Sequence, residues 1–229
     1  MARFQKPLII TFMGPVGVGK STQIQLLKKY LRSRNINVSV TFLKSSHAMS
    51  YVIQRMLVVL GVRETAQYFK GSSRIYPRKE VMKRLFALWC LLDSFSISLK
   101  FFFTVYLPHK LGFTVLIEEG LIMTFYTYAE SFPRFLSVKP KTLKLPAYLL
   151  AWVEKQNHVN IVLDASNKEL DLRRAKRNFR QEELHEYVIM QKRWMQSLDL
   201  HDTIFIETTG KSLSAVRKSI IATVDQRMK

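Results

Sequence analysis

The segment GPVGVGKSTQ, residues 14–23, constrains the fold more than any other part of the sequence. It follows the apolar run PLIITFM (7–13) and precedes a segment in which apolar residues recur at helical spacing. The pattern Gly-x-x-x-x-Gly-Lys-Ser between a strand and a helix is typical of a phosphate-binding loop. The sequence therefore predicts a strand, a tight turn and a helix whose N-terminus faces a phosphate group.

Each residue type in this loop has a chemical reason. Gly17 and Gly19 let the backbone curl so that successive N–H groups face a phosphate, and the helix dipole adds positive potential. We expect Lys20 to reach the β- and γ-phosphates of a triphosphate and the Ser21 hydroxyl to supply an oxygen to Mg²⁺. Thr22 is placed to donate to a nearby phosphate oxygen. The predicted nucleotide-binding residues are Gly14, Pro15, Val16, Gly17, Val18, Gly19, Lys20, Ser21 and Thr22.

Four further apolar runs resemble the one before the loop, at 37–43, 113–119, 159–165 and 203–208. They are rich in β-branched or aromatic residues and apolar on both sides, as strands of a parallel sheet covered on both faces are. Helical segments lie between them. We therefore predict an α/β fold, a doubly wound parallel five-stranded sheet with helices on both faces, in a single domain covering 1–229.

The segment LFALWCLLDSFSISLKFFFTVYL, residues 85–107, is long enough to span a membrane. Asp93 lies near its middle and Lys100 further along, and each costs about 2.5–3.5 kcal/mol at the centre of a bilayer. We therefore expect no membrane span but a long, mostly buried helix inside the domain.

Two stretches interrupt the alternation of strands and helices. Residues 70–80 combine Gly, Ser and Pro turn signals with four basic residues, and residues 132–146 contain three prolines and four basic residues. We expect both to be exposed loops that could face the second substrate.

Lysine and arginine outnumber aspartate and glutamate by 36 to 17, which gives a formal net charge of +19. This excess is larger than a mononucleotide substrate requires and suggests a polyanionic partner such as nucleic acid, although a solvated basic surface would also account for it. Cys90 is the single cysteine, so no intramolecular disulfide can form, and the N-terminal segment does not look like a signal peptide. A cytoplasmic location is the simple expectation.

Two carboxylates, Glu118 and Glu119, end the third apolar run. In phosphotransferases with such a loop, a carboxylate at the end of a neighbouring strand can hold Mg²⁺-bound water or accept the proton of the acceptor hydroxyl. We predict Glu118 as this residue and, together with Ser21, as a metal-binding residue. Two solvated glutamates at a strand end are the alternative.

The segment LDLRRAKRNFR, residues 170–180, is rich in arginine. Arg173 and Arg177 lie one helical turn apart, and guanidinium groups are suited to the charge on the oxygens of a transferring phosphoryl group. We predict a lid at roughly 172–183 in which these two arginines assist catalysis, together with Lys20 and Glu118. A basic, solvated helix face is the alternative.

With these segments in this order, the chain resembles the thymidylate kinase family within the P-loop nucleoside and nucleotide kinase group. The resemblance rests on GxGKSTQxxxLxxxL (17–31), NIVLDASNKELDLRR (160–174), EYVIMQKRWMQSL (186–198) and DTIFIETTGKSLSAVRKSI (202–220). It implies ATP-dependent phosphorylation with Mg²⁺, lid arginines that assist transfer, and residues near 210–212 beside the adenine. Members of this family are commonly dimers, so the resemblance also makes the segment 85–107 a candidate homodimer interface.

The acceptor side departs from the family pattern. The family usually carries an acid inside or just before the loop, where this chain has Met13 and Val16. It usually has an Arg-Glu-Pro segment after the second strand, where this chain has LKSS with Lys44 as the nearest substitute. It usually has Asp-Arg after the third strand, where this chain has Glu118 and Glu119. Paired acids disfavour an acceptor phosphate, because like charges close together weaken binding.

Two functions remain open from the sequence. The first is transfer of the ATP γ-phosphate to a nucleoside monophosphate or a nucleoside, with a hydroxyl on a larger anionic molecule as a third acceptor class. The second is an ATP-binding protein without nucleotide kinase activity that binds nucleic acid through its basic surface. The second function predicts an affinity for nucleic acid that falls steeply with salt concentration.

Overall fold

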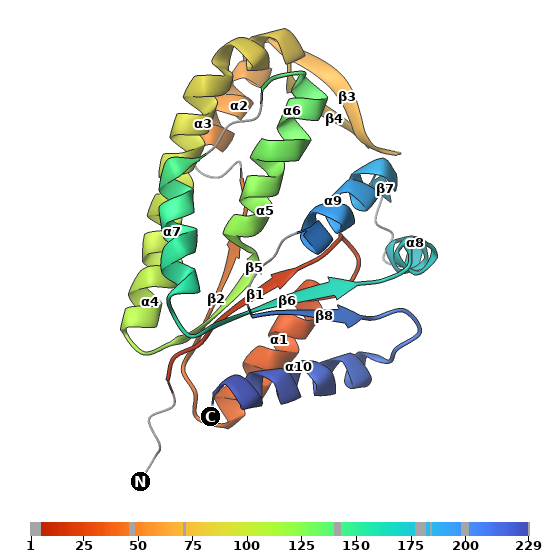
Figure 1. The fold of residues 1–229 in the computed structure, drawn as a ribbon. Helices are drawn as coiled ribbons and strands as arrows, with labels where there is room; N and C mark the ends of the chain where they lie inside the picture. Colours follow the sequence, from red (N-terminus) through yellow and green to blue (C-terminus); the bar gives the residue numbers. More distant parts are fainter. Residues whose placement is uncertain are drawn as a thin grey trace.

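Five parallel strands form the central sheet of the computed structural model, in the order β2-β5-β1-β6-β8 (Figure 1). The structure describes residues 6–45, 49–70, 72–139, 143–176, 182–183, 185–197 and 202–228. The five-stranded parallel sheet expected from the sequence is confirmed. Its strands are β1 (Ile9–Met13), β2 (Val38–Leu43), β5 (Thr114–Glu119), β6 (His158–Asp164) and β8 (Thr203–Glu207).

Strand β1 lies at the centre of this sheet, and all five of its residues are buried. Ile9 aligns with Val115 of β5 on one side and with His158 of β6 on the other. Successive residues of β1 point to opposite faces, so a strand covered on both faces must be apolar throughout. This requirement explains the continuous apolar run before the glycine-rich loop.

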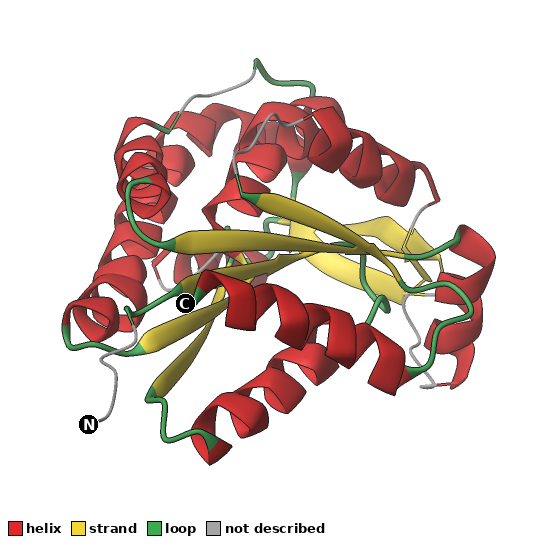
Figure 2. Cartoon of the chain, turned by 60° about the horizontal axis from the view of Figure 1, so that its bottom comes forward, coloured by secondary structure: helices red, strands yellow, loops and turns green. Residues whose placement is uncertain are grey.

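Helices cover both faces of the sheet (Figure 2). On one face, Ile10 and Phe12 pack in a core cluster with α1 (Lys20–Ser33) and α10 (Leu213–Arg227). On the other face, Ile9 and Met13 pack against residues of the remaining large helices. These are α3 (Lys79–Phe101), α5 (Gly120–Tyr126), α7 (Lys144–Glu154) and α9 (His185–Ser197).

The remaining helical elements are mostly short. They are α2 (Met49–Val59), the π-helical segment η1 (Phe102–Tyr106), α4 (Leu107–Lys110), the π-helical segment η2 (Thr127–Ser131), α6 (Phe132–Leu136) and α8 (Asn167–Lys176). α3, η1 and α4 follow one another without a break, so they form one long helical element from Lys79 to Lys110.

A second, three-stranded sheet lies next to α2, and its strands have the order β4-β3-β7. Its strands are β3 (Arg63–Lys70), β4 (Ser72–Pro77) and β7 (Glu182–Glu183), all antiparallel. The prediction of an exposed loop over 70–80 is therefore wrong, because most of this stretch pairs with β3 in a hairpin. The loop predicted over 132–146 is also wrong in part, since the stretch contains α6 and the first turn of α7.

The long helix does not match the expectation of a mostly buried segment at 85–107. It buries one face, but five apolar side chains spaced three or four residues apart on its other face are 45–67% exposed: Leu88, Leu91, Phe95, Leu99 and Phe102. By length and composition, the helix Lys79–Lys110 could cross a membrane, and 39% of its most apolar window is buried. This is weak support for a span, because a core helix of a globular protein meets the same criteria.

Asp93 lies in the middle of α3 with no exposed surface. Its Oδ1 accepts a hydrogen bond of 2.5 Å from the Ser50 hydroxyl of α2, and its Oδ2 accepts one from the Tyr128 hydroxyl of η2. Burial, followed by the charge of Asp93, raises the pKa of Tyr128, so this phenol stays protonated and can donate. The buried carboxylate thus ties three helical elements together.

We expect Tyr128→Phe to lower the free energy of unfolding by about 1.5–3 kcal/mol, because it removes a hydrogen bond to a buried carboxylate. Urea denaturation measures this loss. The matched control is Tyr148→Phe on α7, since the Tyr148 side chain is 76% exposed and its hydroxyl can stay in water. Equal stability of the two variants would contradict the structural role of the buried carboxylate.

Candidate active site

The glycine-rich loop connects β1 to α1 and passes close to the end of β6. Gly14 has a φ of 138°, and a Cβ at this position would lie 2.1 Å from the Leu163 carbonyl oxygen. Gly19, at the N-cap of α1, has a φ of 106°, and a Cβ there would meet nothing within 4 Å. Gly14 is therefore required by space and by backbone conformation, whereas Gly19 is required by conformation alone.

The N-terminus of α1 is open to an anion. Its N-cap residue is Gly19, which has no side chain to cap the helix, and its first turn contains no acidic residue. Unpaired N–H groups and the positive end of the dipole favour a phosphate at such a position. The sequence-predicted loop residues surround this opening: Gly14, Pro15, Val18 and Lys20 are buried, Val16, Gly17, Gly19 and Thr22 are half-buried, and Ser21 is exposed.

Lys20 is folded back against its own loop. Its Nζ donates hydrogen bonds to the carbonyl oxygens of Gly14 at 2.6 Å and Pro15 at 3.2 Å. The same Nζ lies 2.9 Å from Oε1 of Glu119, and the two side chains are 6% and 5% exposed. The ammonium group therefore has three acceptors, which matches its three protons.

Ser21 and Glu118 bring two oxygen atoms together at the mouth of the loop. The Ser21 hydroxyl donates a hydrogen bond of 2.7 Å to Oε1 of Glu118. A hydroxyl and a carboxylate are oxygen ligands of the kind that Mg²⁺ accepts, with its other positions filled by water and phosphate. The two residues named from the sequence as metal ligands are thus adjacent, and their chemistry fits a magnesium ion.

Glu119 holds an unusual backbone conformation, with φ 73° and ψ −59°. This is the conformation of a classic γ-turn, which is rare and strained for a residue with a side chain. Such a conformation costs of order 1–3 kcal/mol and persists where the surroundings determine it. The turn directs the carboxylate inward, toward Lys20, at a position where the sequence gives only a pair of glutamates.

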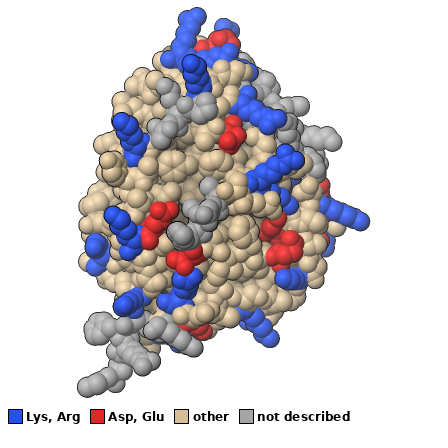
Figure 3. All heavy atoms as spheres, viewed as in Figure 1, with Lys and Arg blue, Asp and Glu red and all other residues tan. Residues whose placement is uncertain are grey.

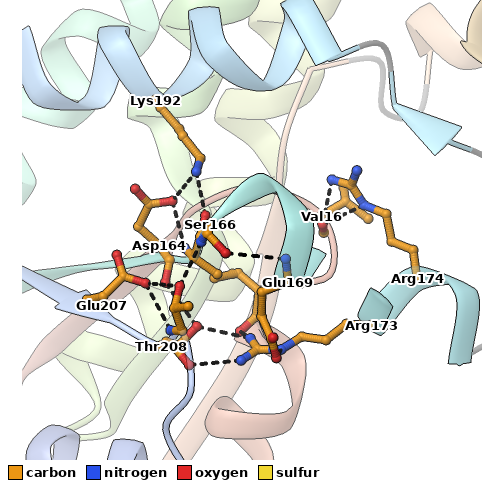
Figure 4. A network of polar contacts seen from close by, with 12 residues as sticks. Val16, Asp164, Ser166, Glu169, Arg173, Arg174, Lys192, Glu207 and Thr208 are labelled. Carbon is orange, nitrogen blue, oxygen red and sulfur yellow. Dashed lines mark hydrogen bonds and ion pairs between the residues drawn. The ribbon is translucent and has the colours of Figure 1, made fainter. Parts of the chain in front are cut away.

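Two arginines of α8 also contact the loop, and Figure 4 shows Arg174 against Val16. The Arg173 guanidinium donates to the Val18 carbonyl at 3.3 Å and to the Thr208 carbonyl at 2.9 Å, and it pairs with Glu169 at 2.9 Å. Arg174 is 5% exposed and donates to the Val16 carbonyl through Nε at 3.1 Å and Nη2 at 2.8 Å. Both arginines thus fix the loop relative to α8.

Of the predicted lid, 172–183, the structure describes two parts. Arg173 and the residues up to Lys176 belong to α8, and Glu182 and Glu183 form β7. Arg177 lies outside the described residues, so its part in catalysis stays a prediction. Arg174 also contacts the loop, a role that the sequence does not predict, because the spacing of 173 and 177 marks a different face of the helix.

A polar network joins the carboxyl ends of β6 and β8. Lys192 of α9 pairs with Asp164 at 2.8 Å, and the Thr208 hydroxyl donates to the Asp164 carbonyl at 2.9 Å (Figure 4). The Glu207 carboxylate accepts from Thr209, and this hydrogen bonding lowers the pKa of Glu207. Because Arg173 also contacts Thr208, the network sets the position of α8 above the loop.

No family model matches the chain. A segment of 41 residues is 49% identical to thymidylate kinase in each of two strains of Rickettsia bellii and covers 18% of this chain and 20% of each relative. A solved thymidylate kinase from Candida albicans superposes with a TM-score of 0.60 over 98% of this chain and 94% of that chain, at 13% identity. The chain has the thymidylate kinase fold.

The resemblance stated from the sequence is thus confirmed at the level of the P-loop kinase architecture. A solved thymidylate kinase from Ehrlichia chaffeensis covers 95% of this chain and 98% of its own, with a TM-score of 0.49 at 17% identity. Proteins that share the thymidylate kinase fold can differ in what they act on, so the activity has to be argued from the site residues.

The two glycines give a matched test of the loop geometry. We expect Gly14→Ala to lower the free energy of unfolding by about 1–3 kcal/mol more than Gly19→Ala, because its methyl group also overlaps the Leu163 carbonyl. Chemical denaturation of both variants without nucleotide measures the difference. Equal losses would mean that the loop does not pass this close to β6.

Proposed function

We propose that this protein transfers the γ-phosphate of ATP to a nucleoside monophosphate or a nucleoside. The proposal rests on two contacts between the start of α1 and the end of strand β5. Lys20 pairs with Glu119, and Ser21 donates a hydrogen bond to Glu118. The N-terminus of α1, a lysine and paired carboxylates thus lie together at one edge of a parallel sheet, and ligands of such folds bind at this kind of edge.

The loop residues have complementary tasks in this proposal. The N–H groups of residues 14–22 hold the phosphates, and Lys20 turns from Glu119 toward the β- and γ-phosphates when ATP binds. Ser21 and Glu118 would hold Mg²⁺, which neutralises charge that develops on the phosphate oxygens when it is bound. The acceptor oxygen bonds to the γ-phosphorus as the bond to the ADP oxygen breaks, and where the acceptor is a nucleoside, its hydroxyl proton is released to solvent.

The lid, roughly 172–183 of the proposed single domain 1–229, closes the site in this scheme. Arg173 and Arg177 are proposed to stabilise the transferring phosphoryl group. In the structure Arg173 is held by Val18, Glu169 and Thr208, so reaching a phosphate requires it to exchange some of these contacts. Residues 210–212, between β8 and α10, are proposed to lie beside the adenine.

The nucleic-acid alternative lacks a specific observation in its favour. On the face seen in Figure 3, the described Lys and Arg side chains are spread over the surface between uncharged areas and do not merge into one basic patch. The net charge of +19 alone does not select nucleic acid. We therefore propose the kinase function and a cytoplasmic location.

The test is transfer of labelled γ-phosphate from ATP to a panel of nucleosides, nucleoside monophosphates and RNA. We expect labelling of a nucleoside or monophosphate, and we expect Lys20→Ala to lower kcat/KM by about 10²–10³-fold because it removes a cation aimed at the transferring group. ATP binding without transfer to any nucleoside or nucleotide would refute the proposed function.

We also propose that the protein forms a homodimer through the exposed face of α3. The apolar stripe from Leu88 of α3 to Phe102, the first residue of η1, is exposed, and an exposed stripe of this kind marks an interaction surface. Phe103 and Leu107 extend the exposed apolar surface beyond α3. A second copy of the same helix would cover it with an equally apolar face.

We expect Phe95→Glu to convert a dimer to a monomer, because it places a charge in the centre of the apolar interface. Light scattering after size-exclusion chromatography gives the mass. The matched control is Leu213→Glu on α10, since Leu213 and Phe95 are both 53% exposed but lie on opposite sides of the sheet. A wild-type monomer, or a Phe95→Glu dimer, would exclude this interface.

A further inference from the structure

The two glutamates at the end of β5 have different surroundings, although they are adjacent in the sequence. Glu118 is half-buried and accepts a hydrogen bond from the exposed Ser21 hydroxyl. Glu119 is 4% exposed, and its Oε1 pairs with Lys20 inside the loop. The two carboxylates are therefore not interchangeable: the first lies at the mouth of the site and the second inside it.

The second oxygen of Glu119, Oε2, lacks a partner among the residues that the structure describes. It is buried and accepts no hydrogen bond from any of them. A buried carboxylate oxygen without a donor is costly, and native proteins rarely retain one without a reason. The strained γ-turn at Glu119 holds the carboxylate in this position. Strain and an unsatisfied acceptor at one residue together indicate a ligand that donates a hydrogen bond.

ATP binding would increase the need of Glu119 for a hydrogen-bond donor. The three protons of the Lys20 ammonium are directed at Gly14, Pro15 and Glu119, so contact with phosphates requires Lys20 to give up some of these acceptors. If the pair with Glu119 is the one exchanged, a buried carboxylate is left beside the phosphates without its cation. It then needs a neutral or cationic donor, and it repels any further phosphate group.

We propose that Glu119 is a specificity-determining residue that accepts a hydrogen bond from a hydroxyl group of the acceptor. The inference rests on the proposed kinase function and narrows it, because it makes the acceptor an uncharged nucleoside and disfavours a nucleoside monophosphate. Glu118 stays with Ser21 at the metal position, and Glu119 replaces its lost lysine contact with the hydroxyl of the acceptor. ATP and a nucleoside then bind cooperatively, whereas a monophosphate opposes the carboxylate.

The test compares kcat/KM for nucleosides and for their 5′-monophosphates, using thymidine, deoxycytidine, deoxyadenosine and deoxyguanosine as probes. We expect wild-type protein to favour a nucleoside over its own monophosphate. We expect Glu119→Arg to lower the nucleoside-to-monophosphate ratio at least tenfold, because it replaces a hydrogen-bond acceptor with a cation that attracts phosphate. Glu154→Gln, an exposed change on α7, should leave the ratio unchanged.

A second variant keeps the test decisive if Glu119→Arg does not fold. Glu119→Gln keeps the size of the side chain and removes its charge, and we expect it to lower the same ratio at least threefold. A merely structural role would change both rates together and leave the ratio constant.

The outcomes separate this inference from the function on which it rests. A wild-type preference for monophosphates, or a ratio that the Glu119 variants leave unchanged, overturns the inference while the kinase function stands. Absence of transfer to every probe, with ATP still bound in calorimetry, overturns both.

Discussion

The ion pair between Lys20 and Glu119 joins the two strands on which the site depends. β1 and β5 are neighbours in the sheet, with Phe12 aligned to Glu118, so the segments that follow them begin side by side. The loop returns Lys20 to the end of β5, and the γ-turn at Glu119 presents the carboxylate to it. The N-terminus of α1 is thus fixed in two ways, by the loop that connects it to β1 and by the ion pair with the end of β5.

Local patterns in the sequence predict the central sheet and the loop. Strands buried on both faces must be apolar throughout. A Cβ at Gly14 would lie 2.1 Å from the Leu163 carbonyl oxygen, so the loop requires glycine there. Both requirements appear as short local patterns in the sequence. The second sheet escaped prediction because β3 pairs with β7, which lies far away along the chain, and because glycine, serine and proline in 70–80 mark a hairpin as readily as a loop.

Side-chain environments were harder to predict than elements. Apolar residues cover α3 on all sides, so hydropathy cannot separate the face packed against the core from the face left exposed. The sequence also does not show that Ser50 and Tyr128 donate hydrogen bonds to Asp93, because the three residues lie on separate helical elements. Glu118 lies beside Ser21, as a metal site shared by the two residues would require, but only the turn geometry distinguishes Glu119 from Glu118.

The pairing of β7 with β3 joins two parts of the chain that are far apart in the sequence. β7 has two residues and follows α8, whose arginines contact the phosphate loop, while β3 belongs to the hairpin next to α2. A ladder of two residue pairs is weak and can open without disturbing the core. Because these two residue pairs link β7 to the β3-β4 hairpin, their opening would release both strands from one another in a single step.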